Sequence, residues 1–351
     1  MRRRLYTVER ILPFFYVLAV IGLAACSTGS PSASTPSPGI TPSATIAQTP
    51  TPTEGPGEII LFGTGALTVD EQAGVMGLLE ELAGSDGWLL RESDDDLLAS
   101  MSPETRAVLI FEEVAALADI AHSHPGTAFI TISTTGDDLP ENVYRIRPHE
   151  DRYDQSAFLS GYVAALVTPD YRIGAIAVAG DGQENAALQG FLNGVVFYCG
   201  LCRPGYYPFI NYPQSATVTS ADPSEVLSAI RTLEDNGVTT VYLSPALNHE
   251  DIFSSLQAED IRVIGSLTPA VPSETSWVAT VAPDLTVGIQ SAWDAWRAGE
   301  GGEVIEPPIK LFSANESLLS PGRIAHIQKI ADDLASGRID TAVDSRTGEA
   351  R

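Results

Sequence analysis

The chain has 351 residues, 44% of them hydrophobic, which excludes wholesale disorder and leaves room for two modest cores. It has 45 acidic residues against 20 Lys and Arg, a formal net charge of −25. A surface this acidic repels phosphate backbones and anionic lipid headgroups, so we expect no nucleic-acid partner.

The first 26 residues have the pattern of an export signal. Arg2, Arg3 and Arg4 form a basic segment, and an apolar stretch follows over 11–25. That stretch is shorter than the roughly 20 residues of a membrane-spanning helix, but it suits a signal-peptide core. It ends in Leu-Ala-Ala-Cys26, which resembles a bacterial lipobox. The resemblance implies cleavage before Cys26 and lipidation of its thiol, whereas an ordinary secretory signal or an uncleaved anchor is the alternative. We therefore expect a lipoprotein anchored in the cell membrane at its extracytoplasmic face.

Residues 27–57 are dominated by Ser, Thr and Pro. Such a segment cannot bury apolar surface, and its prolines favour extended conformations. We interpret it as a tether between the anchor and a globular body, with a glycosylated stalk as the alternative.

From residue 58 onward, short β-branched runs alternate with helical patterns. Strands are expected at 58–62, 108–111, 128–132, 172–179 and 238–243, and helices at about 76–82, 114–121, 184–198, 222–236 and 320–337. The helix at 222–236 has the clearest signals, since Asp222 is placed to cap it, Pro223 occupies its first position and Glu225 is expected to complete a capping box. Repeated βα units predict an α/β fold, and about 290 residues after the tether favour two doubly wound parallel-sheet lobes joined by a hinge.

Three neighbouring segments carry a family resemblance: 154–166 (DQSAFLSGYVAAL), 172–180 (RIGAIAVAG) and 185–194 (NAALQGFLNG). They resemble the basic membrane protein family, the PnrA-like substrate-binding lipoproteins with the type I periplasmic binding fold. The segment 319–339 is similar to that family's C-terminus.

The resemblance implies an extracytoplasmic receptor that closes two lobes over a small polar ligand, nucleoside-like in characterised relatives. Such receptors deliver the ligand to an ABC permease, have no cofactor and are not enzymes. We expect an N-terminal lobe of 58–148 plus 275–304, a C-terminal lobe of 149–274 plus 305–340, and a flexible tail at 341–351. The hinge is expected near 147–151, 268–276 and 302–307.

Two loops depart from the family pattern. An acidic loop after the first strand is replaced by Gly65–Asp70, and a second acidic motif by Ile264–Thr268, so the carboxylates expected to hold a ribose are missing at both. These losses motivate an alternative function, a non-transport ligand sensor or a surface interaction lipoprotein with the same fold.

Ligands of open α/β sheets bind at the carboxyl ends of the strands. Small and hydroxylated residues directly after the expected strands are therefore the candidate ligand-binding residues, and plain loop chemistry is the alternative for each of them. The candidates are Thr64, Gly65, Ser133, Thr134, Gly180, Asp181, Ser244 and Ser266.

Cys199 and Cys202 are the thiols left once Cys26 is lipidated, so a local disulfide is expected outside the cytoplasm. A thioredoxin-like redox function is the alternative, although Cys199 lies at the end of a predicted helix rather than at its start. His122 with His124, and the acidic run 94–96, lack the further ligands of a metal site, and no metal is expected. No G-x-S-x-G motif occurs, and no catalytic residue is assigned.

Overall fold

The computed structural model describes residues 56–93, 96–132, 139–147, 152–207, 209–256, 259, 261–273 and 275–351. The signal segment, Cys26 and most of the tether lie outside the described residues, as do the candidates Ser133 and Thr134 and part of the acidic run 94–96. Residues Thr53–Arg351 form one compact unit. No described helix is both long and apolar enough to span a bilayer.

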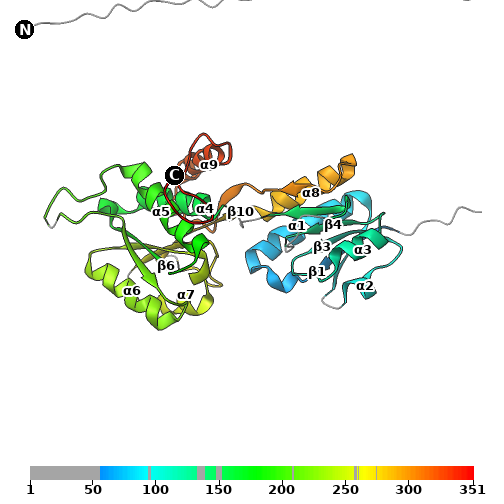
Figure 1. Cartoon of the computed structure of the whole chain (residues 1–351), viewed down its shortest axis with the longest axis horizontal. Coiled ribbons are helices and arrows are strands. Elements are labelled where there is room, and N and C mark those ends of the chain that lie inside the picture. Colours follow the sequence, from blue (N-terminus) through cyan, green and yellow to red (C-terminus); the bar gives the residue numbers. More distant parts are fainter. Residues whose placement is uncertain are drawn as a thin grey trace, which may run out of the picture. The chain divides into compact units, whose positions relative to one another are not determined.

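The first sheet has six strands in the order β11-β5-β4-β3-β1-β2, and all neighbours in it are parallel (Figure 1). Its strands are β1 (Glu58–Phe62), β2 (Leu89–Ser93), β3 (Thr105–Ile110), β4 (Ala128–Thr131), β5 (Val143–Ile146) and β11 (Val304–Ile305). Its helices are the short η1 (Thr64–Ala66), α1 (Val69–Asp86), α2 (Leu97–Ser100), α3 (Leu117–Ser123) and α8 (Leu285–Ala298).

Alternation along β1 shows how both faces of this sheet are covered. Ile59 and Leu61 pack with apolar side chains of α1 and α8, whereas Ile60 and Phe62 pack with those of α2 and α3. Successive side chains of a strand point to opposite faces, so a continuous apolar run produces a strand buried on both sides.

The second sheet repeats the plan with the order β12-β10-β9-β8-β6-β7. Its strands are β6 (Ile173–Val178), β7 (Gln214–Val218), β8 (Thr240–Leu243), β9 (Arg262–Gly265), β10 (Trp277–Pro283) and β12 (Ile309–Phe312), with only the β10–β12 pair antiparallel. Its helices are α4 (Tyr153–Val167), η2 (Pro169–Tyr171), α5 (Gly182–Cys199), α6 (Pro223–Asp235), η3 (Pro245–Leu247), α7 (Glu250–Leu256) and α9 (Pro321–Ala335).

Three segments connect the two lobes. The chain leaves the first sheet after β5, returns between β10 and α8, and leaves again between β11 and β12. The expected return near 268–276, with a lobe boundary at 274/275, differs from the structure, which places it at about Pro283. The reason is that β10 pairs with β9 along one edge and with β12 along the other, which makes it an interior strand of the second sheet.

The C-terminal residues 341–351, expected as a flexible tail, are in contact with the second lobe. Thr341 donates a hydrogen bond to the buried carboxylate of Asp154, and Asn185 Nδ2 donates to the carbonyl of Thr347 at 2.8 Å. Burial raises the pKa of Asp154 above its usual value, and the bond from Thr341 opposes that shift.

Glycines bring α4 and α5 into backbone contact. A Cβ atom built at Gly161 would lie 2.1 Å from the carbonyl oxygen of Phe191, and one at Gly194 would lie 2.0 Å from that of Phe158. Gly161 and Gly194, which belong to the segments that carry the family resemblance, therefore have a packing role, because only hydrogen fits between these helices.

The helix at 223–235 begins as predicted, with the Asp222 carboxylate accepting from the backbone N–H of Ser224 at 2.8 Å. The predicted capping box is wrong. The Glu225 carboxylate instead accepts from the backbone N–H of Thr219 at 2.7 Å, which ties the helix to the end of β7.

Candidate ligand-binding site

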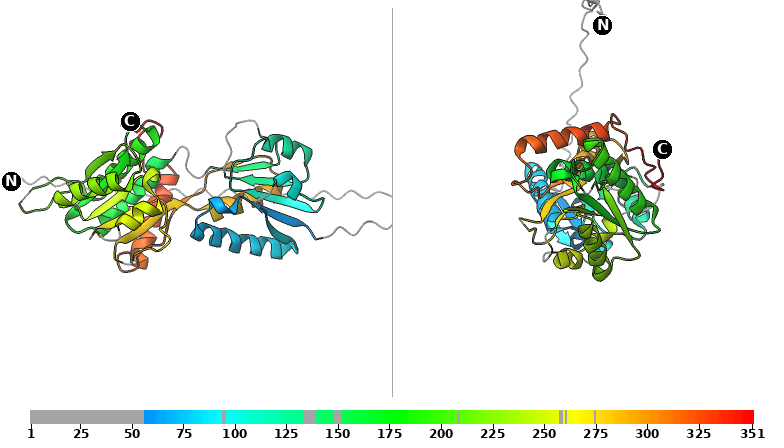
Figure 2. Two further views of the ribbon diagram at one scale, coloured as in Figure 1. Left: turned by 90° about the horizontal axis from the view of Figure 1, so that it is seen from below. Right: turned by 90° about the vertical axis from the view of Figure 1, so that its left-hand side faces the viewer.

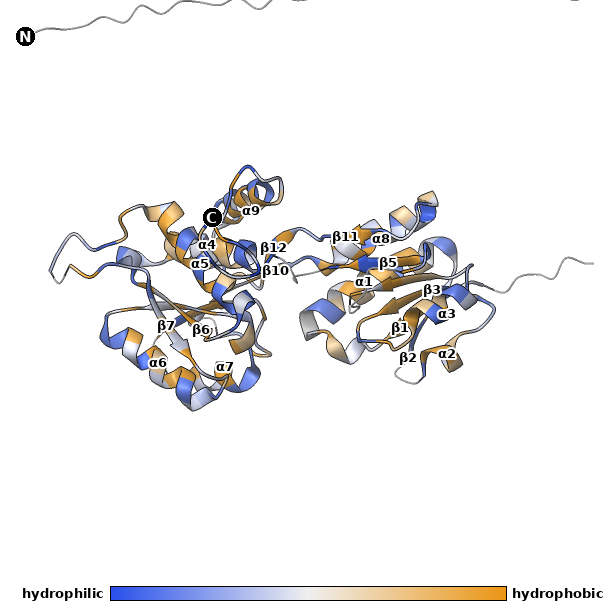
Figure 3. Cartoon of the chain, viewed as in Figure 1, coloured by the Kyte–Doolittle hydropathy of each residue, from blue (hydrophilic) through white to orange (hydrophobic). Residues whose placement is uncertain are grey.

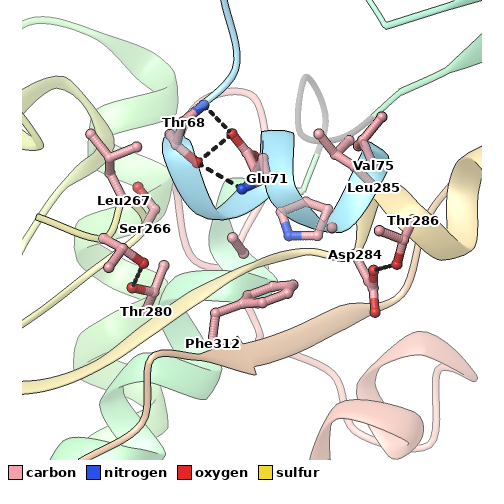
Figure 4. A pocket seen from close by; sticks show the side chains of 14 residues that line it. Thr68, Glu71, Val75, Ser266, Leu267, Thr280, Asp284, Leu285, Thr286 and Phe312 are labelled. Carbon is pink, nitrogen blue, oxygen red and sulfur yellow. Dashed lines mark hydrogen bonds between the residues drawn. The ribbon is translucent and has the colours of Figure 1, made fainter. Parts of the chain in front are cut away.

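A pocket lies beside the segment that connects β10 to α8 (Figure 4). The first lobe contributes the start of α1 and the start of α8 to its wall. The second lobe contributes the loop after β9, the end of β10 and Phe312 on β12. The polar and aromatic side chains of the lining include Thr68, Glu71, Ser266, Thr268, Thr280, Asp284 and Phe312.

The start of α1 presents a carboxylate held in place. Thr68 and Glu71 form a capping box, in which the Thr68 N–H donates to Glu71 Oε2 at 2.9 Å and the Glu71 N–H donates to Thr68 Oγ1 at 3.3 Å. The Thr68 hydroxyl also donates to Oε2 at 2.8 Å. The two bonds from Thr68 fix Oε2, so the carboxylate is oriented on a wall of the pocket before any ligand arrives.

Asp284 caps α8 on the wall formed by the connecting segment. Its Oδ1 accepts from the Thr286 hydroxyl at 2.5 Å and from the Val287 N–H at 3.4 Å, while Lys310 Nζ lies 3.1 Å from Oδ2. Burial alone raises the pKa of Asp284, but the hydrogen bonds from Thr286 and Lys310 and the charge of Lys310 together lower it below its usual value. Asp284 is therefore ionised at neutral pH.

The second-lobe wall combines hydroxyls with an aromatic ring. The hydroxyls of Thr268 and Thr280 lie 2.6 Å apart, and Phe312 lies along the same wall. The Lys310 ammonium is 5.5 Å from the centre of the Phe312 ring, which places a cation over an aromatic face next to the pocket.

This arrangement suits a small polar organic molecule. Oriented oxygens can pair with hydroxyl or amine groups of a ligand, and the Phe312 ring can cover an apolar face of a sugar or a base. Among the described residues no group of three or more His, Cys, Asp or Glu side chains is arranged to hold a metal ion.

Of the sequence-predicted ligand residues that the structure describes, only Ser266 lines this pocket. Thr64 is buried and Gly65 exposed in η1, which precedes the Thr68 cap by a few residues. The structure therefore does not bring the described candidates together around one cavity. The residues that sequence reasoning missed are Thr68, Glu71, Thr268, Thr280, Asp284 and Phe312, and of these the T-x-x-E pattern of Thr68 and Glu71 was a readable helix-start signal.

Two of the remaining candidates have structural partners. Asp181 caps α5 by accepting from the N–H of Gln183 at 2.7 Å, and the buried Ser244 donates its hydroxyl to Glu184. Glu184 is buried too and also accepts from the N–H groups of Val178 and Ala246, at 3.1 and 2.9 Å. This carboxylate fastens the ends of β6 and β8 to α5, which removes the Ser244 hydroxyl from ligand binding.

The other polar signals also have local partners. Cys199 and Cys202 form a disulfide with 5.4 Å between their Cα atoms. His122 Nδ1 lies 2.7 Å from the carbonyl oxygen of Ala118, and His124 Nδ1 lies 3.0 Å from that of Ile120, so both rings contact backbone at the end of α3. Asp96 caps α2 through the N–H of Leu98 at 3.0 Å.

Solved structures share this fold. A solute-binding protein of an ABC transporter system from Conexibacter woesei DSM 14684 superposes with a TM-score of 0.60 at 18% identity, over 82% of this chain and 98% of that chain. A transcriptional activator of the comK gene from Bacillus halodurans gives 0.55 at 14% identity, over 81% and 99%. AraP, an arabinose-binding protein from Geobacillus stearothermophilus, gives 0.50 at 12% identity, over 75% and 98%. No family model and no curated protein matches the chain.

These neighbours confirm the predicted fold class. The chain has the two-lobed α/β architecture of type I periplasmic binding proteins, in which each lobe is a mostly parallel sheet covered by helices. Both lobes have the strand order 2-1-3-4-5-6 in their own numbering, with the order reversing beside the first strand. The names of these three neighbours describe two binding proteins and a transcriptional activator.

Proposed function

We propose that this chain is an extracytoplasmic solute-binding protein that takes a small polar ligand into the pocket beside the β10–α8 connection and delivers it to an ABC permease. The observation that carries the proposal is that both lobes line this pocket, with Glu71 and Asp284 from one and Thr280 and Phe312 from the other. A ligand that contacts both sides has more contacts when the lobes close, and this difference in affinity favours the closed state.

We further propose that the ligand contains a hydroxylated ring, as nucleosides and sugars do. The family resemblance over 154–194 favours a nucleoside, whereas the name of one structural neighbour refers to arabinose. Glu71 and Asp284 supply carboxylates that are absent from the two loops where the family pattern has them. In this proposal Glu71 pairs with ligand hydroxyls, and Phe312 lies against the ring.

Membrane tethering is part of the same proposal. It rests on the lipobox-like end of the signal segment and on the Ser/Thr/Pro-rich segment that follows Cys26. Replacing Cys26 with Ser should release the protein from the membrane fraction and abolish labelling by a radioactive fatty acid. Retention of label on the variant would overturn lipidation at this thiol.

A panel of nucleosides, pentoses, hexoses and amino acids tests ligand binding by thermal unfolding of the Thr53–Arg351 unit. A ligand at 100 times its dissociation constant should raise the free energy of unfolding by about 2.7 kcal/mol. The variant Phe312→Ala should bind the hit at least about tenfold more weakly, because a ligand-facing ring is lost. Phe209→Ala is the matched control, since it removes an exposed ring outside the pocket lining and should leave the affinity unchanged.

A sensor that does not serve import is the second candidate. It is motivated by the altered loops at 65–70 and 264–268, and one neighbour with this fold is named as a transcriptional activator. Ligand-dependent stimulation of ATP hydrolysis by a reconstituted permease favours import. Ligand binding without such stimulation by any permease encoded beside the chain favours sensing.

A further inference from the structure

The loop between α5 and β7 extends from the second lobe (Figures 2 and 3), and several large apolar side chains in and beside it are exposed. Leu201 and Tyr207 are each 84% exposed, and Phe209 is 60% exposed. Phe197 and Val196, on the last turns of α5, are 53% and 46% exposed. Single exposed apolar residues are ordinary, but several in one short segment point to a surface that contacts something.

The base of this loop is held by covalent and polar links. The disulfide joins Cys199 to the buried Cys202, whose carbonyl accepts from the N–H of Tyr212 at 2.8 Å. The Tyr206 hydroxyl donates to Asp170 Oδ2 at 2.6 Å and accepts from Arg172 Nη2 at 2.9 Å. Leu201, Tyr207 and Phe209 therefore project from a loop whose ends are fixed.

The charge of this part of the chain differs from the rest. Residues 185–221 contain no Asp or Glu and one cation, Arg203, in a chain of net charge −25. The Arg203 guanidinium lies 5.9 Å from the centre of the Phe209 ring. The electrostatic repulsion that keeps the acidic body away from an anionic surface is therefore absent from this segment.

We propose that the loop tip, defined as residues 200–209, inserts into the interfacial region of a lipid bilayer. Tyr, Phe and Leu side chains beside an Arg are the composition that this region accepts, with rings at the headgroup level and the guanidinium near phosphate. Exposed side chains such as these can enter a lipid layer without a complementary pocket, whereas a protein partner would need one.

The inference rests on the tethering in the proposed function, which brings the body close to a membrane. The segment between Cys26 and Pro56 can span up to roughly 100 Å when extended, at about 3.3–3.6 Å per residue. The tether therefore gives the loop tip the reach to touch the same membrane, and contact at the loop tip would orient the body.

A test that does not depend on Cys26 uses the unit Thr53–Arg351, which contains both complete sheets. The protein carries a hexahistidine tag at Thr53 and is attached to phosphatidylcholine vesicles that contain nickel-chelating lipid. In Tyr207→Trp, the added indole should be quenched by lipids brominated along their acyl chains. In Val271→Trp, which places an indole at a 70% exposed position outside the loop tip, no added quenching is expected. Equal quenching of the two variants, or none of either, overturns the proposal.

Flotation of the untagged unit with vesicles measures the contribution of the side chains. Leu201→Ser/Tyr207→Ser/Phe209→Ser should weaken binding at least about tenfold, since three apolar side chains lose their lipid contact. The control Leu89→Ser/Leu98→Ser/Val271→Ser removes side chains that are 60%, 50% and 70% exposed and should bind like the parent. Both variants should keep the parent's thermal unfolding midpoint, because the replaced side chains are exposed.

Two other results would show that the loop tip binds a protein rather than a membrane. A dimer in light scattering that the loop-tip variant dissociates would assign the loop to a second copy of this chain. Failure to bind protein-free vesicles, together with binding to vesicles that contain the permease, would assign it to that protein. Ligand binding by the loop-tip variant is measured separately, so loss of membrane contact leaves the proposed function intact.

Discussion

Lys310 on β12 and Asp284 at the start of α8 form an ion pair with 3.1 Å between Nζ and Oδ2. β12 belongs to the second sheet, whereas α8 packs on the first, so the pair joins two of the segments that connect the lobes. Asp284 is buried and Lys310 is half exposed. The same carboxylate thus caps a helix, lines the pocket and neutralises a cation.

The lowered pKa of Asp284 predicts a contribution to stability that depends on pH. A carboxyl whose pKa is lower in the folded state stabilises the protein above its unfolded value, near 3.8, and this stabilisation is lost as the pH falls through the folded value. Asp284→Asn keeps a capping side chain and should lower the free energy of unfolding at pH 7 but not at pH 2. Asp284→Ala should cost a further 1 kcal/mol or so at both pH values, because the cap is lost. Urea unfolding across this pH range measures both, and a parallel loss for Asp284→Asn at pH 2 and 7 contradicts the assignment.

The contact between α4 and α5 predicts opposite effects for two glycine substitutions. Gly194→Ala should destabilise the protein by about 3 kcal/mol or prevent folding, since its methyl group would collide with the carbonyl of Phe158 in the facing helix. Gly77→Ala is the matched control, because Gly77 lies within α1 and nothing stands within 4 Å of an added Cβ. That variant should gain up to about 1 kcal/mol from helix propensity. Similar midpoints of thermal unfolding for the two variants would refute the packing role.

Glu184 and Glu225 occupy the same position in two helices but differ in burial. Each lies three residues after a capping Asp, and each accepts a backbone N–H from the end of the preceding strand. Glu184→Ala removes the acceptor of three donors, the buried Ser244 hydroxyl and two part-buried N–H groups, and should cost about 3 kcal/mol. Glu225→Ala should cost far less, since water reaches the groups it leaves. Equal losses in denaturant unfolding would show that burial of the carboxylate is unimportant.

Removing the disulfide should affect stability without affecting ligand binding. The bond closes a loop of four residues, so the double variant Cys199→Ser/Cys202→Ser should lose about 2 kcal/mol of unfolding free energy. The affinity for the ligand found in the panel should stay the same, because neither cysteine lines the pocket. A loss of affinity together with a redox-dependent activity would instead favour the thioredoxin-like alternative.

The fold class was readable because its signals are local. Apolar runs such as 58–62 and 173–178 and the capping residues of α6 and α9 define βα units without reference to distant parts of the chain. Strands with mixed exposure were missed: β2 and β7 lie at the edge of their sheets, where one side lacks a partner strand and polar residues are tolerated. β10 is buried along its whole length, but Thr280 and Pro283 interrupt its apolar pattern.

The site was less predictable because its residues come from four separate segments. The candidates were chosen because they follow a predicted strand directly. This criterion selected Asp181 and Ser244, whose polar groups form hydrogen bonds within the second lobe. Asp284 lies between β10 and α8 and Phe312 at the end of β12, and their proximity depends on the lobe topology rather than on local sequence. Only the capping pattern of Thr68 and Glu71 was visible in the sequence, and it signals a helix start, not a pocket.

Because the chain passes between the two sheets three times, neither lobe is a continuous segment, and this affects how the lobes fold. The first lobe lacks α8 and β11 until residue 305 has been synthesised, by which point all but one strand of the second sheet already exists. An emerging chain therefore cannot complete the first lobe before the second has begun. Apolar residues such as Ile59 and Leu61 lack their packing partners Ile289 and Trp293 until those are synthesised. For the export proposed above, this delay would keep the chain unfolded for longer, which favours passage through a translocon that accepts only unfolded polypeptide.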